Sequence, residues 1–308
     1  MNASATHPPA LRRGDRIGII APASCIDSAM LEAGCNALIS LGYEPVYSPS
    51  ILDRDLYFAG SLERRVHEFH EMWQRKDVRA IICARGGYGT NYLLDRIDLE
   101  MVKQVPKIFM GYSDVTTLLT WFADQGLVTF HGPMVTKDFG SGLVDLPSFS
   151  AATSGEGFAI SLAASAVEVL VPGVAEGILY GGCLSMLVAS LGTAYSAQTE
   201  GKLLLLEDVA AKPYQIDRML MHLKLAGKLH DVKGIIFGEM LDCVQPGGQS
   251  YTLQHIVLRV LGDLRIPIVY GLPSGHVSKP NITLPLGARA KLHASPEGSI
   301  EIEAAATR

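Results

Sequence analysis

The stretch Val105-Pro-Lys-Ile-Phe-Met-Gly-Tyr-Ser-Asp-Val-Thr-Thr-Leu-Leu-Thr-Trp-Phe122 indicates a buried strand, an abrupt turn and a helix. Residues 107–110 are a short apolar run, and apolar side chains then recur from Val115 at the i, i+3, i+4 and i+7 spacing of a helix. Ser113 lies on the turn between them. A serine there would project its hydroxyl at the carboxyl edge of a sheet, beside the free N–H groups that begin the helix. The alternative is a helix cap, in which Ser113 accepts the N–H of Thr116.

The same alternation of strand and helix surrounds this stretch, from residue 16 to residue 131. The expected strands are 16–21, 44–47, 78–84, 107–110 and 128–130, and the expected helices are 28–41, 61–75, 90–97 and 114–124. Such alternation predicts a parallel sheet covered on both faces, with any site at its carboxyl edge. The segments that reach this edge are Ala21-Pro-Ala-Ser24, Arg85-Gly-Gly-Tyr-Gly89, Gly111-Tyr-Ser113 and His131-Gly-Pro133.

The second half of the chain has a different pattern. Residues 141–173 are rich in Gly and Pro and lose the alternation, so we expect a linker there, between an N-terminal domain at 1–140 and a smaller C-terminal domain at 174–308. In the latter, strands at 202–206, 234–238 and 266–270 alternate with helices. Three short segments with alternating polar and apolar residues, at 282–286, 288–293 and 299–303, predict antiparallel strands. The fold class is therefore α/β.

The composition describes a globular protein that is large enough for two domains. The chain has 308 residues, of which 48% are hydrophobic and 19% are charged. The net charge of -5 comes with scattered Lys and Arg, so nucleic acid is not an expected partner. Five cysteines without a C-x-x-C pair suit reduced thiols. The apolar runs at 17–20 and 177–199 are too short or too broken for a signal peptide or a membrane span, so we expect a cytoplasmic protein without a membrane partner.

The loop Arg85-Gly-Gly-Tyr-Gly89 follows a strand, where a phosphate-binding loop is possible. It lacks the Gly-Lys-Ser/Thr of a P-loop, and Tyr92 occupies the place of the third glycine in G-x-G-x-x-G. Its backbone N–H groups could still face an anion, including the oxyanion of a tetrahedral intermediate. The alternative is a tight turn without a ligand.

A nucleophilic serine needs a base, and two histidines are candidates. His276 lies in a Gly- and Pro-rich loop after a strand, and His131 ends another strand, although either could be an ordinary structural histidine. His67 and His70 miss the H-E-x-x-H spacing, so we expect no metal site there.

The base needs an acid that orients its ring. Glu207 is the best candidate because it ends a strongly apolar strand, where a charge is costly unless it is paired. Asp208 and Glu239 are alternatives at similar strand ends. The order Ser113, Glu207, His276 along the chain matches that of α/β-hydrolases.

These residues lie in motifs that resemble those of the LD-carboxypeptidases of murein recycling, a serine peptidase family that also includes the microcin C self-immunity carboxypeptidases. The matching motifs follow one another over nearly the whole chain. They are Ile17-Gly-Ile-Ile-Ala-Pro-Ala-Ser24, Phe58-Ala-Gly60, Arg85-Gly-Gly-Tyr-Gly89, Gly111-Tyr-Ser-Asp114, Thr129-Phe-His-Gly-Pro133, Tyr180-Gly-Gly182, Leu206-Glu-Asp208, Gly275-His276 and Thr283-Leu-Pro-Leu-Gly287.

The resemblance implies a catalytic triad in which Ser113 is the nucleophile, Glu207 the acid and His276 the base. It also implies an oxyanion hole formed by the backbone N–H groups of Gly86 and Asp114. The expected fold is a flavodoxin-like N-terminal domain and a C-terminal domain of mixed sheet and helices, with the site at their junction, usually in a homodimer. No cofactor is implied.

By the same resemblance, the substrate is a murein tetrapeptide, cut at the L,D-peptide bond between meso-diaminopimelate and the terminal D-alanine. Candidate substrate-binding residues are Arg85, Gly87, Tyr88, Cys183 and His131, the last as a wall of the site. Cys183 stands where the family commonly has Asn, and a thiol cannot replace the donors and acceptor of an amide. The alternative functions are a microcin-C-type immunity carboxypeptidase and a non-catalytic ligand-binding protein.

Overall fold

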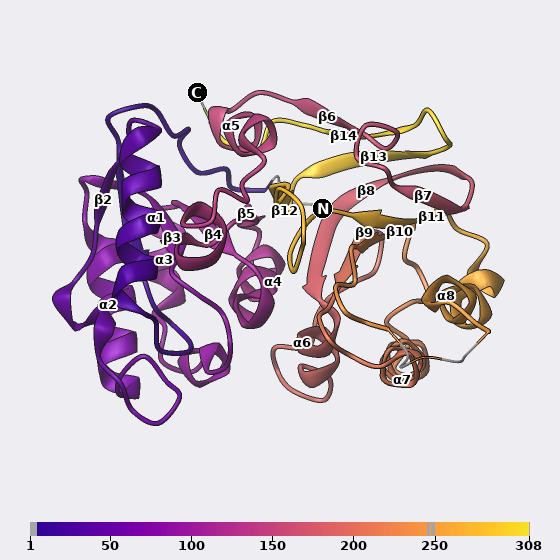
Figure 1. Ribbon diagram of the computed structural model, residues 1–308, viewed down its shortest axis with the longest axis horizontal. Coiled ribbons are helices and arrows are strands. Elements are labelled where there is room, and N and C mark those ends of the chain that lie inside the picture. The colour runs from indigo at the N-terminus through magenta and orange to yellow at the C-terminus, as the bar shows by residue number, and fades with distance from the viewer. Residues whose placement is uncertain (1–4, 245–246, 248–249, 308) are drawn as a thin grey trace.

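The first sheet of the computed structural model contains the parallel strands that the N-terminal alternation predicts (Figure 1). The structure describes residues 5–244, 247 and 250–307. Parallel pairing gives the order β2-β1-β3-β4-β5, which is the flavodoxin-like order, so the predicted fold class is confirmed. The strands are β1 (Arg16–Ile20), β2 (Glu44–Val46), β3 (Val78–Cys83), β4 (Ile108–Gly111) and β5 (Thr129–His131).

Helices α1, α2 and α3 begin where short polar side chains cap them. Asp27, Ser61 and Asp98 accept backbone N–H groups at the starts of α1, α2 and α3. The bounds are α1 (Ser28–Ser40), α2 (Leu62–Gln74), α3 (Leu99–Gln104) and α4 (Thr116–Asp124), with short 3-10 turns at η1 (Pro49–Leu52), η2 (Thr90–Leu93) and η3 (Ser113–Val115) and a π-helical turn at η4 (Val135–Phe139).

The helix expected at 90–97 is wrong. Only the turn η2 forms there, and the helix α3 follows instead. The physical reason is that the backbone N–H and hydroxyl of Thr90 bind Asp114, while Asp98 supplies a cap eight residues later in the sequence. The chain therefore restarts as a helix at Leu99.

The second sheet has eight strands in the order β6-β14-β13-β8-β9-β10-β11-β7. Its centre, β8 to β11, is parallel, and the outer strands pair antiparallel, so the sheet is mixed as expected. The strands are β6 (Phe158–Ser161), β7 (Glu168–Val171), β8 (Gly173–Cys183), β9 (Lys202–Glu207), β10 (Gly234–Gly238), β11 (Ile268–Leu272), β13 (Arg289–Ala294) and β14 (Ser299–Ile302). The helices of this half are α6 (Leu184–Ala189), α7 (Pro213–Leu225) and α8 (Leu253–Leu261), with η5 (Gly262–Leu264).

The segment expected to be an irregular linker, 141–173, is largely ordered into elements. It contains α5 (Leu146–Ser154) and both edge strands of the second sheet, β6 and β7. Its glycines and prolines mark the turns between these elements rather than a spacer. The division into domains at 140 and 174 stays a prediction, and its outer limits, residues 1 and 308, lie outside the described residues.

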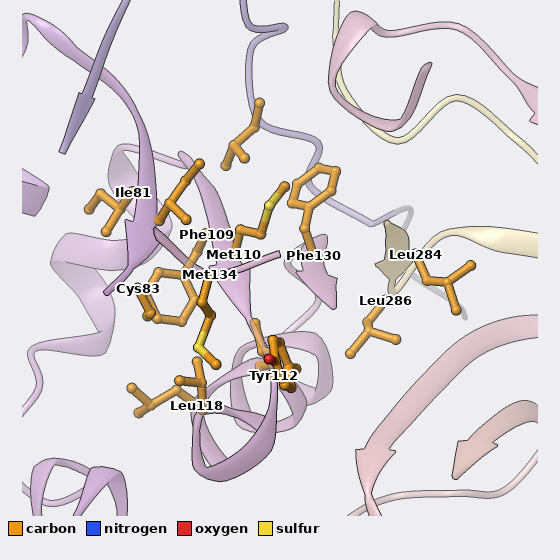
Figure 2. Close-up of a cluster of buried hydrophobic side chains, with 14 of the residues drawn as sticks. Ile81, Cys83, Phe109, Met110, Tyr112, Leu118, Phe130, Met134, Leu284 and Leu286 are labelled. Atoms are coloured by element: carbon orange, nitrogen blue, oxygen red, sulfur yellow. The ribbon is translucent and has the colours of Figure 1, made fainter. Parts of the chain in front are cut away.

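The tail of the chain returns to the first sheet. Strand β12 (Leu284–Leu286), expected among the antiparallel strands of the second half, pairs antiparallel with β5 instead. Leu284 and Leu286 are buried, and they lie beside Phe130 of β5 in the cluster that also holds Tyr112 (Figure 2). This core anchors the residue that precedes Ser113.

The second sheet is covered on both faces. One face, with Leu203, Leu205 and Ile236, belongs to the same buried cluster as the first sheet. The other, with Leu204 and Leu206, packs in a separate cluster with α6, α7 and α8. The two sheets therefore share a core and lie side by side (Figure 1). Within the described part of the chain, no helix is both long and apolar enough to cross a membrane.

Candidate active site

Ser113 lies on a strained turn between a strand and a helix. Strand β4 ends at Gly111, and Ser113 has φ of +63°, a left-handed conformation that is uncommon for any residue other than glycine. The backbone N–H of Thr116 donates to the carbonyls of Ser113 and Asp114, and no side chain caps η3 or α4. The alternative in which Ser113 caps the helix is therefore wrong. Its partly exposed hydroxyl is left available for another role.

The glycine loop after β3 lies against Ser113. A Cβ placed on Gly86 would lie 2.8 Å from Ser113 Cβ and 3.1 Å from Ser113 Oγ. Gly87 has φ of +106°, and a Cβ there would lie 2.3 Å from the hydroxyl of Ser24. Ser24 fixes the loop, because its N–H donates to Gly86 O (3.3 Å) and its hydroxyl accepts the N–H of Tyr88 (3.1 Å). Only glycine allows the backbone this close to Ser113 at position 86 and to Ser24 at position 87.

The carboxylate of Asp114 is part of the scaffold. It is buried and accepts the backbone N–H of Thr90 at 2.8 Å. Burial raises the pKa of Asp114, and the Thr90 hydrogen bonds oppose that rise. Its side chain is therefore tied to η2, which leaves its backbone N–H as the group of interest beside Ser113.

Glu207 and His276 form a close pair on the second sheet. Glu207 ends β9, is fully buried, and accepts both Nδ1 (2.7 Å) and the backbone N–H (2.9 Å) of His276 on Oε2. Burial by itself raises the pKa of Glu207, but the interactions with His276 and His131 outweigh it and hold the pKa well below its usual value. The acid is therefore ionised, and Nδ1 of His276 must carry the proton that it donates. Nε2 is left without that proton and can act as a base.

Glycine again makes the approach possible. Gly275 has φ of +98°, and a Cβ there would lie 2.5 Å from the Glu207 carboxyl carbon. A Cβ on Gly238 would lie 2.6 Å from Glu207 Cβ. Glu239 holds the far end of the loop, because its carboxylate accepts the backbone N–H of Ser278 at 3.0 Å.

One cavity of about 590 Å³ brings Ser113 and His276 together. The Tyr112 and His276 rings are nearly perpendicular in a T-shaped contact, with centroids 5.1 Å apart. Two cations, Arg85 and Lys137, also line the cavity. The Arg85 guanidinium donates to the carbonyl of Cys25 (3.0 Å), whereas Lys137 Nζ lies 5.9 Å from the Tyr112 ring centroid.

The other predicted residues differ in whether they line this cavity. Gly86 and Gly87 line the cavity with Arg85. Tyr88, His131 and Cys183 are not among the described residues that line it. Tyr88 is exposed and packs with Tyr57, Phe58 and Tyr92; Cys183 is buried and donates its N–H to Thr116 Oγ1 (3.1 Å); His131 is buried behind Glu207.

The two alternative acids do not contact the base. Asp208 accepts the backbone N–H groups of Ser185 (2.9 Å) and Val209 (2.8 Å). Glu239 instead holds Ser278. Of the three candidate acids, Glu207 is the one that contacts His276.

Lys137 was not among the residues predicted from the sequence. It lies on the π-helical turn η4, directly after β5. The available signal is its position in the sequence, because Lys137 follows within a few residues of His131-Gly-Pro133, a segment predicted to lie at the carboxyl edge of the sheet. A lone lysine in a segment without clear periodicity gave no further indication.

Two family models match the chain. The model described as the LD-carboxypeptidase N-terminal domain matches residues 17–132, and that described as the LD-carboxypeptidase C-terminal domain matches residues 176–292. Ser113 falls in the first match, and Glu207 and His276 fall in the second. The serine and the acid–histidine pair therefore lie in the regions matched by the N-terminal and C-terminal models of one family.

Individual proteins agree with these matches. The chain is 38% identical over 300 residues to the "Probable murein peptide carboxypeptidase" of Bacillus subtilis strain 168, covering 95% of this chain and 93% of that protein. The crystal structure of a muramoyltetrapeptide carboxypeptidase from Oxalobacter formigenes is 30% identical, with a TM-score of 0.85 over 95% of this chain and 100% of that one. A structure of MccF with glutamyl sulfamoyl guanosine is 25% identical, with a TM-score of 0.90 over 98% of this chain and 99% of that one. This chain belongs to the LD-carboxypeptidase family and is a serine-type carboxypeptidase.

Proposed function

We propose that this carboxypeptidase acts on murein peptides and hydrolyses the L,D-peptide bond between meso-diaminopimelate and a terminal D-alanine, as part of peptidoglycan recycling. The substrate class rests on similarity to relatives that carry murein peptide carboxypeptidase names. The observation that carries the chemistry is the Glu207–His276 pair, whose histidine lines the same cavity as the strained Ser113.

The proposed reaction begins with attack by Ser113 Oγ on the scissile carbonyl. His276 Nε2 takes the serine proton and then gives it to the departing amine of D-alanine. Glu207 keeps the imidazole in the required tautomer and stabilises its cation. Water, activated by the same histidine, then hydrolyses the acyl-enzyme and regenerates Ser113.

The oxyanion of the tetrahedral intermediate needs donors that are already in place. We assign this role to the backbone N–H groups of Gly86 and Asp114, because both flank Ser113 and Gly86 approaches it as closely as a glycine can. One such donor contributes about 3 kcal/mol in comparable sites.

A carboxypeptidase must also bind a free carboxylate. Arg85 and Lys137 are the cations that line the cavity in the described part of the chain. Arg85 already donates to the carbonyl of Cys25, so Lys137 has the freer charge. We assign the substrate carboxylate to Lys137.

The second candidate is a microcin-immunity type of carboxypeptidase that uses the same triad. It is favoured by the TM-score of 0.90 to MccF. A nucleotide-containing substrate would need an aromatic platform for its base, and Tyr112 and His276 are the aromatic rings among the described residues that line the cavity. Tyr112 is 1% exposed, so it offers little face for stacking.

The test is D-alanine release from L-Ala-D-Glu-meso-diaminopimelate-D-Ala, followed by mass spectrometry. Wild type should release D-alanine, and Ser113→Ala should lose at least about 10³-fold in rate. Ser40→Ala, at an exposed serine that ends α1, is the matched control and should keep full activity. Equal release by wild type and Ser113→Ala contradicts the serine mechanism.

Covalent labelling separates chemistry from substrate. A fluorophosphonate should label Ser113 in wild type, and the label should be located by peptide mapping. Labelling without D-alanine release means that the substrate is wrong, and a peptide–nucleotide conjugate is then the next substrate. No labelling and no release would favour the non-catalytic ligand-binding alternative.

The family resemblance also supports two proposals about the protein in the cell. We expect a cytoplasmic homodimer. Light scattering on the purified protein tests the dimer, and fractionation of cells that express it tests the location.

A further inference from the structure

Glu207 has a second oxygen that the proposed triad does not use. Oε2 receives both hydrogen bonds from His276, whereas Oε1 is buried without a hydrogen-bond partner among the described residues. The atom that faces it is His131 Nε2, 3.8 Å away, which is equally buried and equally without a partner. Both side chains have no exposed surface. Two such groups would not be left facing each other unless their approach were favourable.

The hydrogen bonds of Ser274 fix the proton on the other nitrogen of His131. The Ser274 hydroxyl lies 2.9 Å from the carbonyl oxygen of Ile282 and 3.0 Å from His131 Nδ1. A carbonyl only accepts, so Ser274 gives its single proton to Ile282 and must accept from His131 Nδ1. Nδ1 of His131 therefore carries a hydrogen.

The proton on Nδ1 determines how Nε2 of His131 interacts with the Glu207 carboxylate. With a hydrogen on Nδ1, a neutral His131 would present the Nε2 lone pair to the carboxylate, which is repulsive in a buried site. A second proton on Nε2 makes the same approach an attraction between opposite charges.

We propose that His131 is a positioning residue of the active site: its imidazolium ring holds Oε1 of Glu207 while His276 occupies Oε2. This inference rests on the proposed roles of Ser113, Glu207 and His276. Glu207 is thereby fixed from both sides, and its orientation fixes that of the base.

The contact also joins the two sheets at the site. His131 ends β5 and pairs in register with Gly111 of β4, two residues before Ser113, whereas Glu207 ends β9. The strand beside the one that leads to Ser113 and the strand that carries Glu207 thus meet through one buried ion pair. A Cβ on Gly182 of β8 would lie 3.3 Å from His131 Cδ2, so the ring has little freedom to turn away.

Besides His276, the titratable groups near this pair include Tyr112, Cys183 and Asp208, whose carboxylate accepts the backbone N–H groups of Ser185 and Val209. Burial raises the pKa of Tyr112, whose ring centroid lies 6.1 Å from that of His131. Burial also raises the pKa of Cys183, the β8 partner of Glu207. Of the described residues, His131 (3.8 Å) and His276 (2.7 Å) are the ones whose ring nitrogens approach the Glu207 carboxylate.

The experiment measures the rate of fluorophosphonate labelling of Ser113 from about pH 5 to about pH 9, because this rate reports activation of the serine without any choice of substrate. His131→Gln keeps a neutral N–H donor, and His131→Leu keeps the approximate size without a donor. His230→Gln, at an exposed histidine, is the matched control.

We expect His131→Leu to lower the plateau rate about tenfold or more, with His131→Gln recovering most of it. In both variants the acidic limb of the profile should move to higher pH, because loss of a positive charge lets the Glu207–His276 pair take up a proton more readily. A purely structural role would not move that limb.

The proposal would be overturned if the acidic limb of the pH profile stayed in place in both variants, or if His131→Leu kept the wild-type plateau rate of labelling. If His131→Leu does not fold, the limb in His131→Gln decides alone. A wild type that is not labelled contradicts the serine mechanism itself, and that result is distinct from labelling that ignores His131.

Discussion

The two sheets hold their parts of the proposed active site by different means. On the first sheet, Ser113 is fixed by backbone conformation: a left-handed turn, and glycines that let the loop after β3 come close. On the second sheet, His276 is fixed by side-chain charge and hydrogen bonds to Glu207. Steric changes should therefore damage the part on the first sheet, whereas changes of charge should damage the part on the second sheet and alter the pH dependence of the activity.

The largest effect should come from the charged half. Glu207→Gln removes the carboxylate that holds His276, and we expect kcat to fall about 10³–10⁴-fold because the amide can favour the wrong tautomer. The check is the rate of D-alanine release, with Glu297→Gln at an exposed site as the control. A loss below tenfold would mean that the charge of Glu207 is not needed.

The same variant has a stability signature. The folded-state pKa of Glu207 is depressed, so its contribution to the unfolding free energy is present above its ordinary value of 4.5 and is lost as the pH falls through the folded-state pKa. The difference in unfolding free energy between wild type and Glu207→Gln should therefore shrink as the pH is lowered below about 4.5, as measured by urea unfolding. A constant difference contradicts the depressed pKa.

A steric change tests the other half of the comparison. Gly86→Ala places a Cβ 2.8 Å from Ser113 Cβ, so the loop must move away and its N–H with it. We expect kcat/KM to fall about 10²–10³-fold without displacement of the pH profile. Gly262→Ala, where an added Cβ meets nothing within 4 Å, is the matched control. A displaced pH profile of kcat/KM would show that the parts of the site on the two sheets do not act independently.

The smallest effect should come from substrate recognition. Lys137→Met should raise KM about tenfold for a substrate with a free carboxylate, since a hydrogen bond to a charged group is lost. It should change KM little for the corresponding carboxamide. Arg85→Met is the matched comparison. It should leave the ratio of the two KM values, carboxylate to carboxamide, as in wild type, because the Arg85 guanidinium donates to the carbonyl of Cys25. The reverse result would assign the carboxylate to Arg85.

Local patterns in the sequence predicted the parts that depend on local physics. The strand, turn and helix around Ser113 follow from periodicity, and the expectation that Glu207 is paired follows from a charge at the end of an apolar strand. The contact between His131 and Glu207 could not be predicted this way, because it depends on how two sheets pack. The pairing of β12 with β5 could not be predicted for the same reason, since two strands so far apart in the sequence leave no local signal of their pairing. Strands β6 and β7 are four residues each, too short for a clear alternation among glycines and prolines.

The position of β12 has a consequence for making the protein. During synthesis the edge of β5 stays open until residues 284–286 have left the ribosome, because that late strand is its outer neighbour. A truncated product that stops near residue 140 would display an unpaired strand edge and the apolar surface that Leu284 and Leu286 cover. Exposed edges of this kind pair with other chains and aggregate. The sheet that carries Ser113 is thus completed only once almost the whole chain is available, so we expect truncated products to aggregate and not to accumulate as folded, partly active enzyme.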